Sequence, residues 1–203
     1  TDPHGRALEY SQPAAAEQKK ISAVTEKRPL VCDKYIITEE DSEGRLLSID
    51  FKNTERFNFA FDIIDETAAK TPDKLALLHL SKDKTERRFS FSDISRLSSR
   101  AANYFRAIGI KKSDRVLLVM KRHWQFWPAI LGLQKLGAIA IPATNQLLKK
   151  DYEYRFNTAG VSAIVCTADG EATNEVEKAL PASPTVKTKI SVNGKKDGWL
   201  DFD

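Results

Sequence analysis

The sequence predicts an α/β fold: a mostly parallel, doubly wound sheet with helices on both faces. Short, continuous apolar runs alternate with helical patterns from residue 110 onward. The helical patterns end at Gly137, Gly160 and Pro181, which are typical stop signals. Strands that are apolar along their whole length belong to sheets buried on both faces. Right-handed crossovers between such strands give an open, doubly wound sheet.

A helix is expected first, shortly after residue 57. Asn58 can cap it, and it ends at Lys70, shortly before Pro72. Its apolar or small residues recur at helical spacing and form a face to be buried. That face consists of Ala60, Ile63, Ile64 and Thr67.

A hairpin and a second helix follow. The run 74–80 is a strand, and the turn SKDK leads to its hairpin partner at 86–91. Ser92 is expected to cap the next helix, which Gly109 ends. Its apolar positions are spaced by three and four residues: Ile94, Leu97, Ala101, Phe105 and Ile108.

The alternating region predicts four parallel strands and three connecting helices. The strands are expected at 115–120, 138–141, 161–165 and 186–192, with helices at 124–136, 151–158 and 171–180. The run 138–141 is apolar throughout, so we expect a buried strand there.

The domain organisation divides near residue 50. Residues 1–50 are expected to form a partly irregular tail or entry segment with a short strand at 35–38, and residues 51–203 to form the α/β lobe.

Charge and cysteine content exclude several classes of protein. A net charge of +4, from 32 basic and 28 acidic side chains, is mild, and the lysine pairs are scattered, so we expect no nucleic-acid partner. No apolar run reaches the length of a membrane span, and no signal-peptide core is present. Cys32 and Cys166 are far apart, which argues against a disulfide framework or a zinc site. We therefore expect a cytoplasmic protein without a membrane partner, and Cys166 as an ordinary buried thiol.

Familiar nucleotide and catalytic motifs are missing. Neither GxGxxG nor GxxxxGK[ST] occurs, and the piece NGKKDG at 193–198 is a turn. His4, His79 and His123 are isolated in sequence; His79 is expected to be a half-buried strand residue, and His123 lies at a helix start. Trp124, Phe126 and Trp127 are more typical of core or subunit contacts than of a pocket wall. The sequence therefore indicates no catalytic residue and no metal ligand.

The loop after the run 138–141 is the one unusual feature. Thr144, Asn145 and Gln146 follow directly after Pro142. Ligands of parallel sheets bind at the carboxyl ends of the strands. Such uncharged hydrogen-bonding side chains are therefore either a plain loop or the lip of a binding site.

Several stretches resemble the amino-terminal part of the AMP-forming acyl-CoA synthetases, in the adenylate-forming superfamily, and most closely the medium-chain enzymes. They are GIKKSDRVLLVM, HWQFWPAILGLQKLGAIAIPATNQLLKKDYEYRF, VSAIV and DGWLDF. The IP-x-T-x-Q step, the D-x-x-YR helix and the DGW-L-F end carry the likeness to that branch. NFAFDIIDETAAKTPDKLAL resembles the family's entry segment. The likeness covers residues 35–203, and 109–156 is its most specific part.

The resemblance implies a parent enzyme that joins a short- or medium-chain carboxylic acid to CoA with ATP and magnesium. The carboxylate attacks the α-phosphorus of ATP, and the CoA thiol then displaces AMP. In the medium-chain enzymes the glutamine of IP-x-T-x-Q touches CoA, which implies that Gln146 contacts CoA here. An amide can donate to a phosphate or accept from a pantetheine amide. Alternatively, Gln146 caps the following helix or faces water.

The sequence also departs from the family. The phosphate loop TSGTTG-x-PK is missing, and in the family it lies beyond the position of Asp203, as do the magnesium ligand and the catalytic lysine. We therefore expect residues 1–203 alone to be catalytically incompetent, to bind no cofactor tightly and to self-associate through exposed apolar surface. Two alternatives stay open: a stand-alone interaction or regulatory module derived from this lobe, and a response-regulator-like domain, although the latter's acidic pocket is missing.

Overall fold

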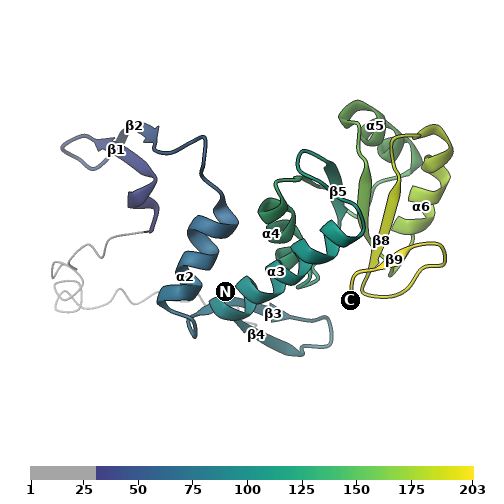
Figure 1. Ribbon diagram of the computed structural model, residues 1–203, viewed down its shortest axis with the longest axis horizontal. Helices are drawn as coiled ribbons and strands as arrows, with labels where there is room; N and C mark the ends of the chain where they lie inside the picture. Colours follow the sequence, from purple (N-terminus) through teal and green to yellow (C-terminus); the bar gives the residue numbers. More distant parts are fainter. Residues whose placement is uncertain (1–30) are drawn as a thin grey trace, which may run out of the picture. The chain divides into compact units, whose positions relative to one another are not determined.

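The computed structural model describes residues 31–203, and the chain divides into two compact units after Glu55. In the first unit a short 3₁₀ turn, η1 (Val31–Lys34), precedes an antiparallel hairpin of β1 (Ile36–Glu40) and β2 (Leu46–Phe51) (Figure 1). Residues 36–38 of the strand expected at 35–38 belong to β1, whereas β2 was not anticipated. Expectations for residues 1–30, including His4, lie outside the described residues.

The second unit begins with a helical segment. A π-helical stretch, η2 (Ala60–Asp65), continues into α2 (Glu66–Lys70). The Asn58 side-chain oxygen accepts a hydrogen bond from the backbone N–H of Ala60 at 3.0 Å. The expected role of Asn58 at the start of this helix is therefore confirmed.

The predicted hairpin and the long helix after it are present, but the cap differs. β3 (Leu75–Leu80) pairs antiparallel with β4 (Glu86–Ser90), and α3 (Phe91–Ala107) follows without a loop. Ser90, not Ser92, caps α3: its hydroxyl accepts from the Asp93 N–H at 3.2 Å, and the Asp93 carboxylate accepts from the Ser90 N–H at 3.1 Å. The capping box Ser-x-x-Asp decides the start of the helix, because it satisfies two backbone donors at once.

The parallel sheet has five strands in the order β6-β5-β7-β8-β9. All four neighbouring pairs are parallel, and Leu117 of β5 lies opposite both Ile141 of β6 and Ile164 of β7. The strands are β5 (Arg115–Val119), β6 (Ile139–Pro142), β7 (Ala163–Thr167), β8 (Thr188–Val192) and β9 (Leu200–Asp201).

Helices cover both faces of this sheet, as the doubly wound prediction requires (Figure 1). Leu118 packs with Phe105 of α3 and with α4 (Phe126–Leu136). The adjacent Leu117 points the opposite way, into the layer of α5 (Lys149–Ala159) and α6 (Ala172–Ala179), where Tyr152 is buried. A short 3₁₀ turn, η3 (Leu180–Ala182), ends α6.

Two details of the sheet differ from the sequence prediction. β6 is only half-buried, and Ile139 is 44% exposed, because β6 is an edge strand with one neighbour. The short strand β9 was not predicted, since two residues are too few to produce a strand pattern. Trp199 and Phe202, which flank β9, pack on opposite faces of the sheet.

No helix in the described part of the chain, residues 31–203, is long and apolar enough to cross a bilayer.

Helices α3 and α4 approach very closely at Gly132. A Cβ built at Gly132 would lie 2.7 Å from Ala101 Cβ and 2.9 Å from the Ala102 backbone nitrogen. These distances leave no space for a methyl group unless the helices separate. Glycine at this position therefore sets the spacing of the layer that covers one face of the sheet.

We predict that Gly132→Ala lowers the free energy of unfolding by about 1–3 kcal/mol, measured by urea denaturation. This loss outweighs the helix-propensity gain of about 1 kcal/mol for alanine. In an Ala101→Gly background the same substitution should cost less, because one of the clashing atoms is gone. The close packing would be contradicted if Gly132→Ala lowered the free energy of unfolding equally in both backgrounds. It would also be contradicted if the single variant were more stable than the unmodified chain.

Candidate functional site

The loop between β6 and α5 presents Gln146 at the carboxyl edge of the sheet. Leu147 is buried, 7% exposed, and packs with Tyr152 in the core beneath the loop. Its neighbours Gln146 and Leu148 are exposed. The Gln146 N–H donates to Thr144 Oγ1 at 3.3 Å. One buried leucine and one short turn thus hold Gln146 outward.

The side chain of Gln146 has no hydrogen-bond partner among the described residues. It does not cap α5, because it accepts no hydrogen bond from the first turn of that helix; there the Asp151 carboxylate accepts from the backbone N–H of Leu148 at 3.0 Å. Of the two alternatives to ligand contact, capping is therefore wrong. An exposed amide with free donors and acceptors is left at the edge of the sheet.

A surface depression of about 310 Å³ adjoins this amide. The loops after β5, β6 and β7 and the start of α6 supply its walls. Its lining residues are Lys121, Asn145, Gln146, Leu147, Leu148, Asp169, Gly170, Glu171, Ala172 and Glu175. The parallel sheet thus brings three strand ends to one small site, as ligand sites in such sheets require.

An ion pair forms part of the wall of this depression. Lys121 Nζ lies 2.6 Å from Asp169 Oδ2. The Lys121 ammonium also lies against Gly170, where an added Cβ would be 3.4 Å from Nζ. Gly170 has a φ of +89°, a conformation that side chains disfavour. Glycine therefore lets the loop after β7 turn around the lysine.

His123 and Thr167 complete a four-residue network with this pair. His123 Nε2 lies 2.9 Å from Thr167 Oγ1 and 3.2 Å from Asp169 Oδ1, and the Thr167 hydroxyl also donates to Asp169. His123 is therefore not isolated, contrary to the sequence prediction. The sequence did contain a signal for this network. His123 follows Lys121 by two residues just after one strand, and Thr167 and Asp169 lie at the end of the strand that pairs with it.

This network keeps Asp169 ionised. Partial burial by itself would raise the pKa of Asp169, but hydrogen bonds from Lys121, Thr167 and His123 outweigh it and lower the pKa to about 2. By contrast, burial raises the pKa of the Cys166 thiol to about 12. Cys166 is fully buried, as expected, and is protonated at neutral pH.

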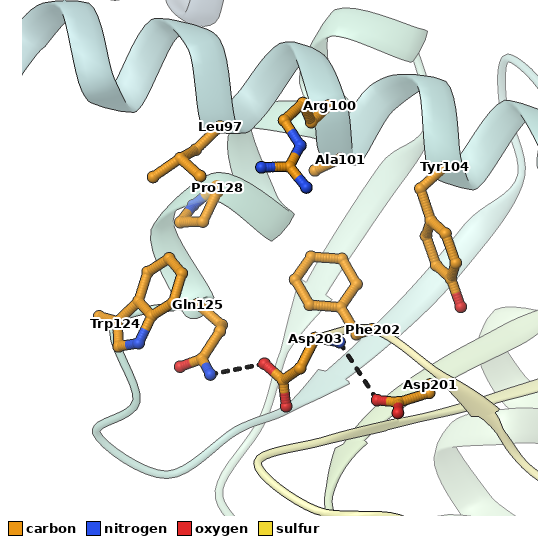
Figure 2. Close-up of a pocket in the computed structure, with 10 residues that line it drawn as sticks. All are labelled: Leu97, Arg100, Ala101, Tyr104, Trp124, Gln125, Pro128, Asp201, Phe202 and Asp203. Carbon is orange, nitrogen blue, oxygen red and sulfur yellow. Dashed lines mark hydrogen bonds between the residues drawn. The ribbon is translucent and has the colours of Figure 1, made fainter.

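A larger depression of about 420 Å³ lies between α3, the start of α4 and the residues around β9 (Figure 2). Trp124 forms part of its wall and stacks on Phe89 with ring centroids 5.1 Å apart. The Gln125 amide donates to Asp203 at 2.7 Å, and Figure 2 draws this hydrogen bond as a dashed line. Trp124 thus lies at a pocket wall, although the sequence favoured a core or subunit contact, whereas Phe126 packs against the core. None of the residues expected to bind a ligand lies in this depression.

Together these features define a doubly wound α/β domain with a polar depression at the carboxyl ends of adjacent parallel strands. Residues 64–201 match the family model described as AMP-binding enzyme. The chain therefore belongs to the AMP-binding enzyme family, in agreement with its sequence resemblance to AMP-forming enzymes.

Curated relatives are similar over most of this chain. It is 34% identical over 160 residues to acyl-coenzyme A synthetase ACSM1, mitochondrial, of Mus musculus, which covers 75% of the chain and 28% of the relative. It is 33% identical over 168 residues to acyl-coenzyme A synthetase ACSM2A, mitochondrial, of Homo sapiens. This match covers 78% of the chain and 29% of the relative. The chain thus spans between a quarter and a third of the length of these relatives.

Solved structures support the fold. Acetoacetyl-CoA synthetase from Streptomyces lividans superposes with a TM-score of 0.64 and 19% identity, covering 71% of this chain and 24% of that one. The anthranilate CoA ligase AuaEII, solved in complex with anthranoyl-AMP, superposes with a TM-score of 0.61 and 22% identity. This match covers 71% of this chain and 26% of that one.

We predict that the Asp169 carboxyl titrates near pH 2 in NMR-monitored titration, and that Lys121→Ala raises this value. Because the folded pKa lies below the ordinary 3.8, the linked stability is full above about pH 4 and is lost as pH falls toward 2. For this partly exposed group we expect about 1 kcal/mol at most. As a control, Lys82→Ala in the β3–β4 turn should leave the titration unchanged. An unchanged value in Lys121→Ala would contradict the pairing.

Proposed function

We propose that this chain is the sheet-and-helix lobe of an ATP-dependent, AMP-forming acyl-CoA synthetase acting on a short- or medium-chain carboxylic acid. The observation that carries the proposal is the family match over residues 64–201. The relatives named above are acyl-CoA synthetases, which supports a ligase activity for the protein to which this lobe belongs.

The reaction explains why such a lobe needs a site at its sheet edge. A carboxylate is a poor electrophile, so its oxygen attacks the α-phosphorus of ATP, and pyrophosphate leaves. The CoA thiol then attacks the acyl carbon of the acyl-adenylate, and AMP leaves. The protein must align two reactants in each step and stabilise the developing charge.

In this proposal the lobe contributes a CoA contact through Gln146 and no catalytic residue. Its exposed, unpartnered amide beside the depression supports that role. The described residues contain no group of three or more His, Cys, Asp or Glu side chains suited to a metal ion, and Asp169 is already paired with Lys121. They do not fit magnesium, so no step is assigned to a metal here.

A stand-alone interaction module is the second candidate. The hairpin β1–β2 exposes large apolar side chains, among them Leu47 at 67% and Phe51 at 69% exposed. Such side chains favour contact with another surface, including a second copy of the chain. The coding sequence distinguishes the two: a TSGTTG-like stretch shortly after the codon of Asp203 supports the synthetase, and a stop codon there supports the module.

The compartment and the acyl substrate stay predictions. The sequence favours the cytoplasm, whereas the relatives carry "mitochondrial" in their names. Subcellular fractionation separates the two. The likeness to medium-chain enzymes favours short or medium acids over aromatic ones.

We predict that the purified 203-residue chain releases no pyrophosphate above background from ATP with a panel of short and medium acids. The reason is that its sequence lacks the phosphate loop TSGTTG-x-PK. Hydroxamate trapping of acyl-AMP provides an independent readout, and an intact acyl-CoA synthetase serves as the positive control. Turnover that persists through purification would overturn the expectation.

We predict that Gln146→Ala weakens CoA binding to the chain by about threefold to tenfold, measured by calorimetric titration. One lost hydrogen bond to a neutral partner has about this value. Asn103→Ala, which removes an exposed amide on α3, is the matched control and should bind CoA normally. Equal binding by both variants would remove Gln146 from the site.

A further inference from the structure

The turn after β8 contains a sequence that has no role in the proposed function. Residues 193–198 read NGKKDG, and Asn193 is the only asparagine of the chain that is followed by glycine. Asn193 and Gly194 are both exposed to solvent. Such a pair has a chemistry of its own, which is independent of acyl-CoA synthesis.

The backbone of this turn has a conformation that suits glycine. Asn193 has a φ of +58°, and Gly194 has a φ of +133°. Glycine adopts the second value without strain because it has no Cβ. A Cβ built on Gly194 would lie 3.3 Å from Ala168 Cβ, so this position also has little space for a side chain. The backbone nitrogen of residue 194 is therefore not shielded by a side chain of its own.

The side-chain amide of Asn193 and the backbone N–H of Gly194 have no hydrogen-bond partner within residues 31–203. The structure instead uses the backbone N–H of Asn193, which donates to Asp203 Oδ2 at 2.6 Å. The Asn193 side chain can therefore rotate toward the next peptide nitrogen without breaking a hydrogen bond.

An asparagine in this setting can lose ammonia without a catalyst. The backbone nitrogen of Gly194 attacks Cγ of Asn193, a C–N bond forms, and ammonia leaves with the proton of that nitrogen. Water then opens the cyclic succinimide. Cleavage of the bond between the nitrogen and Cγ gives aspartate, whereas cleavage of the bond between the nitrogen and the backbone carbonyl carbon gives isoaspartate. The sum is one water consumed and one ammonia released, with no change of oxidation state.

Asn193 is also part of a clasp on the wall of the larger depression. One carboxylate oxygen of Asp203 accepts the Asn193 N–H. The other oxygen accepts the Gln125 amide at 2.7 Å, the hydrogen bond drawn in Figure 2. Asp201, Phe202 and Asp203 all line that depression. The turn after β8 thus helps to fix the carboxylate that ties this wall to the start of α4.

We propose that Asn193 is a site of spontaneous deamidation, and that its conversion opens this clasp. Either product places a carboxylate at residue 193, near the Asp203 carboxylate, and like charges repel each other. Isoaspartate also lengthens the backbone of the turn by one carbon. Both changes break the hydrogen bond between residue 193 and Asp203. This inference does not depend on the proposed function.

The reaction is followed by mass spectrometry of proteolytic peptides, after incubation of the folded chain in mildly alkaline buffer at physiological temperature. Asn53 is the matched internal control, because it is exposed and has a φ of +57° but is followed by Thr54. We expect the peptide with Asn193 to gain the mass difference between OH and NH₂ about tenfold faster than the peptide with Asn53, since the β-branched Thr54 is stiff and crowds its own nitrogen. Isoaspartate is expected among the products, because direct hydrolysis of the amide gives only aspartate.

The opening of the clasp is tested in Asn193→Asp, which carries one of the two products. We expect the hydrogen-exchange protection factor of the residue 193 N–H, measured by NMR, to fall about fivefold, which corresponds to one lost hydrogen bond. Asn53→Asp adds the same charge at the control position and should leave that protection factor unchanged.

Each part of the inference has a result that would overturn it. If Asn193 reacts no faster than Asn53, or reacts only after the chain is unfolded in urea, the folded turn does not hold a reactive pair. If aspartate is the only product, the amide is hydrolysed directly and no succinimide forms. If Asn193→Asp keeps the protection factor of the unmodified chain, the conversion does not open the clasp.

Discussion

The structure depends on the burial of β5 and β7 on both faces. Every side chain from Val116 to Val119 is fully buried, and successive residues point into opposite layers. A strand of this kind is stable only if helices cover both sides of the sheet. The crossovers that supply those helices make the strands parallel, so all strand ends with the same polarity lie at one edge. The close approach of α3 and α4 at Gly132 and the polar depression both follow from this requirement.

The depression is a product of strand order. Lys121 and Asp169 are 48 residues apart in sequence, yet they form an ion pair because β5 and β7 are adjacent. β6 lies on the other side of β5 and brings Gln146 to the same edge. In an antiparallel arrangement, one of these loops would lie at the opposite end of the sheet. Topology thus assembles polar groups that no local pattern connects.

The sequence predicted the element order and the two-faced sheet well, because runs such as 115–120 and the stop at Gly137 reflect local physics. It predicted less where tertiary contacts decide. Ser92 looked like a cap, but the capping box of Ser90 and Asp93 begins the helix two residues earlier. The edge strand β6 is half-buried, but its apolar sequence is like that of a central strand, so the sequence alone does not distinguish the two. His123 looked isolated, since its partners depend on which strands are neighbours. Gln146 came from family resemblance, because the local pattern alone fits a plain loop as well as the lip of a binding site.

The buried side chain of Leu147 has a consequence for how this loop can diverge among related proteins. Inside and outside alternate residue by residue around Leu147, so replacing Gln146 alters only the chemistry offered to solvent. Inserting or deleting a single residue between Pro142 and Leu147 would instead force either the amide into the apolar layer or the leucine out of it. The length of this loop is therefore more tightly constrained by the structure than the identity of the residue at position 146, which can change with the ligand that is bound.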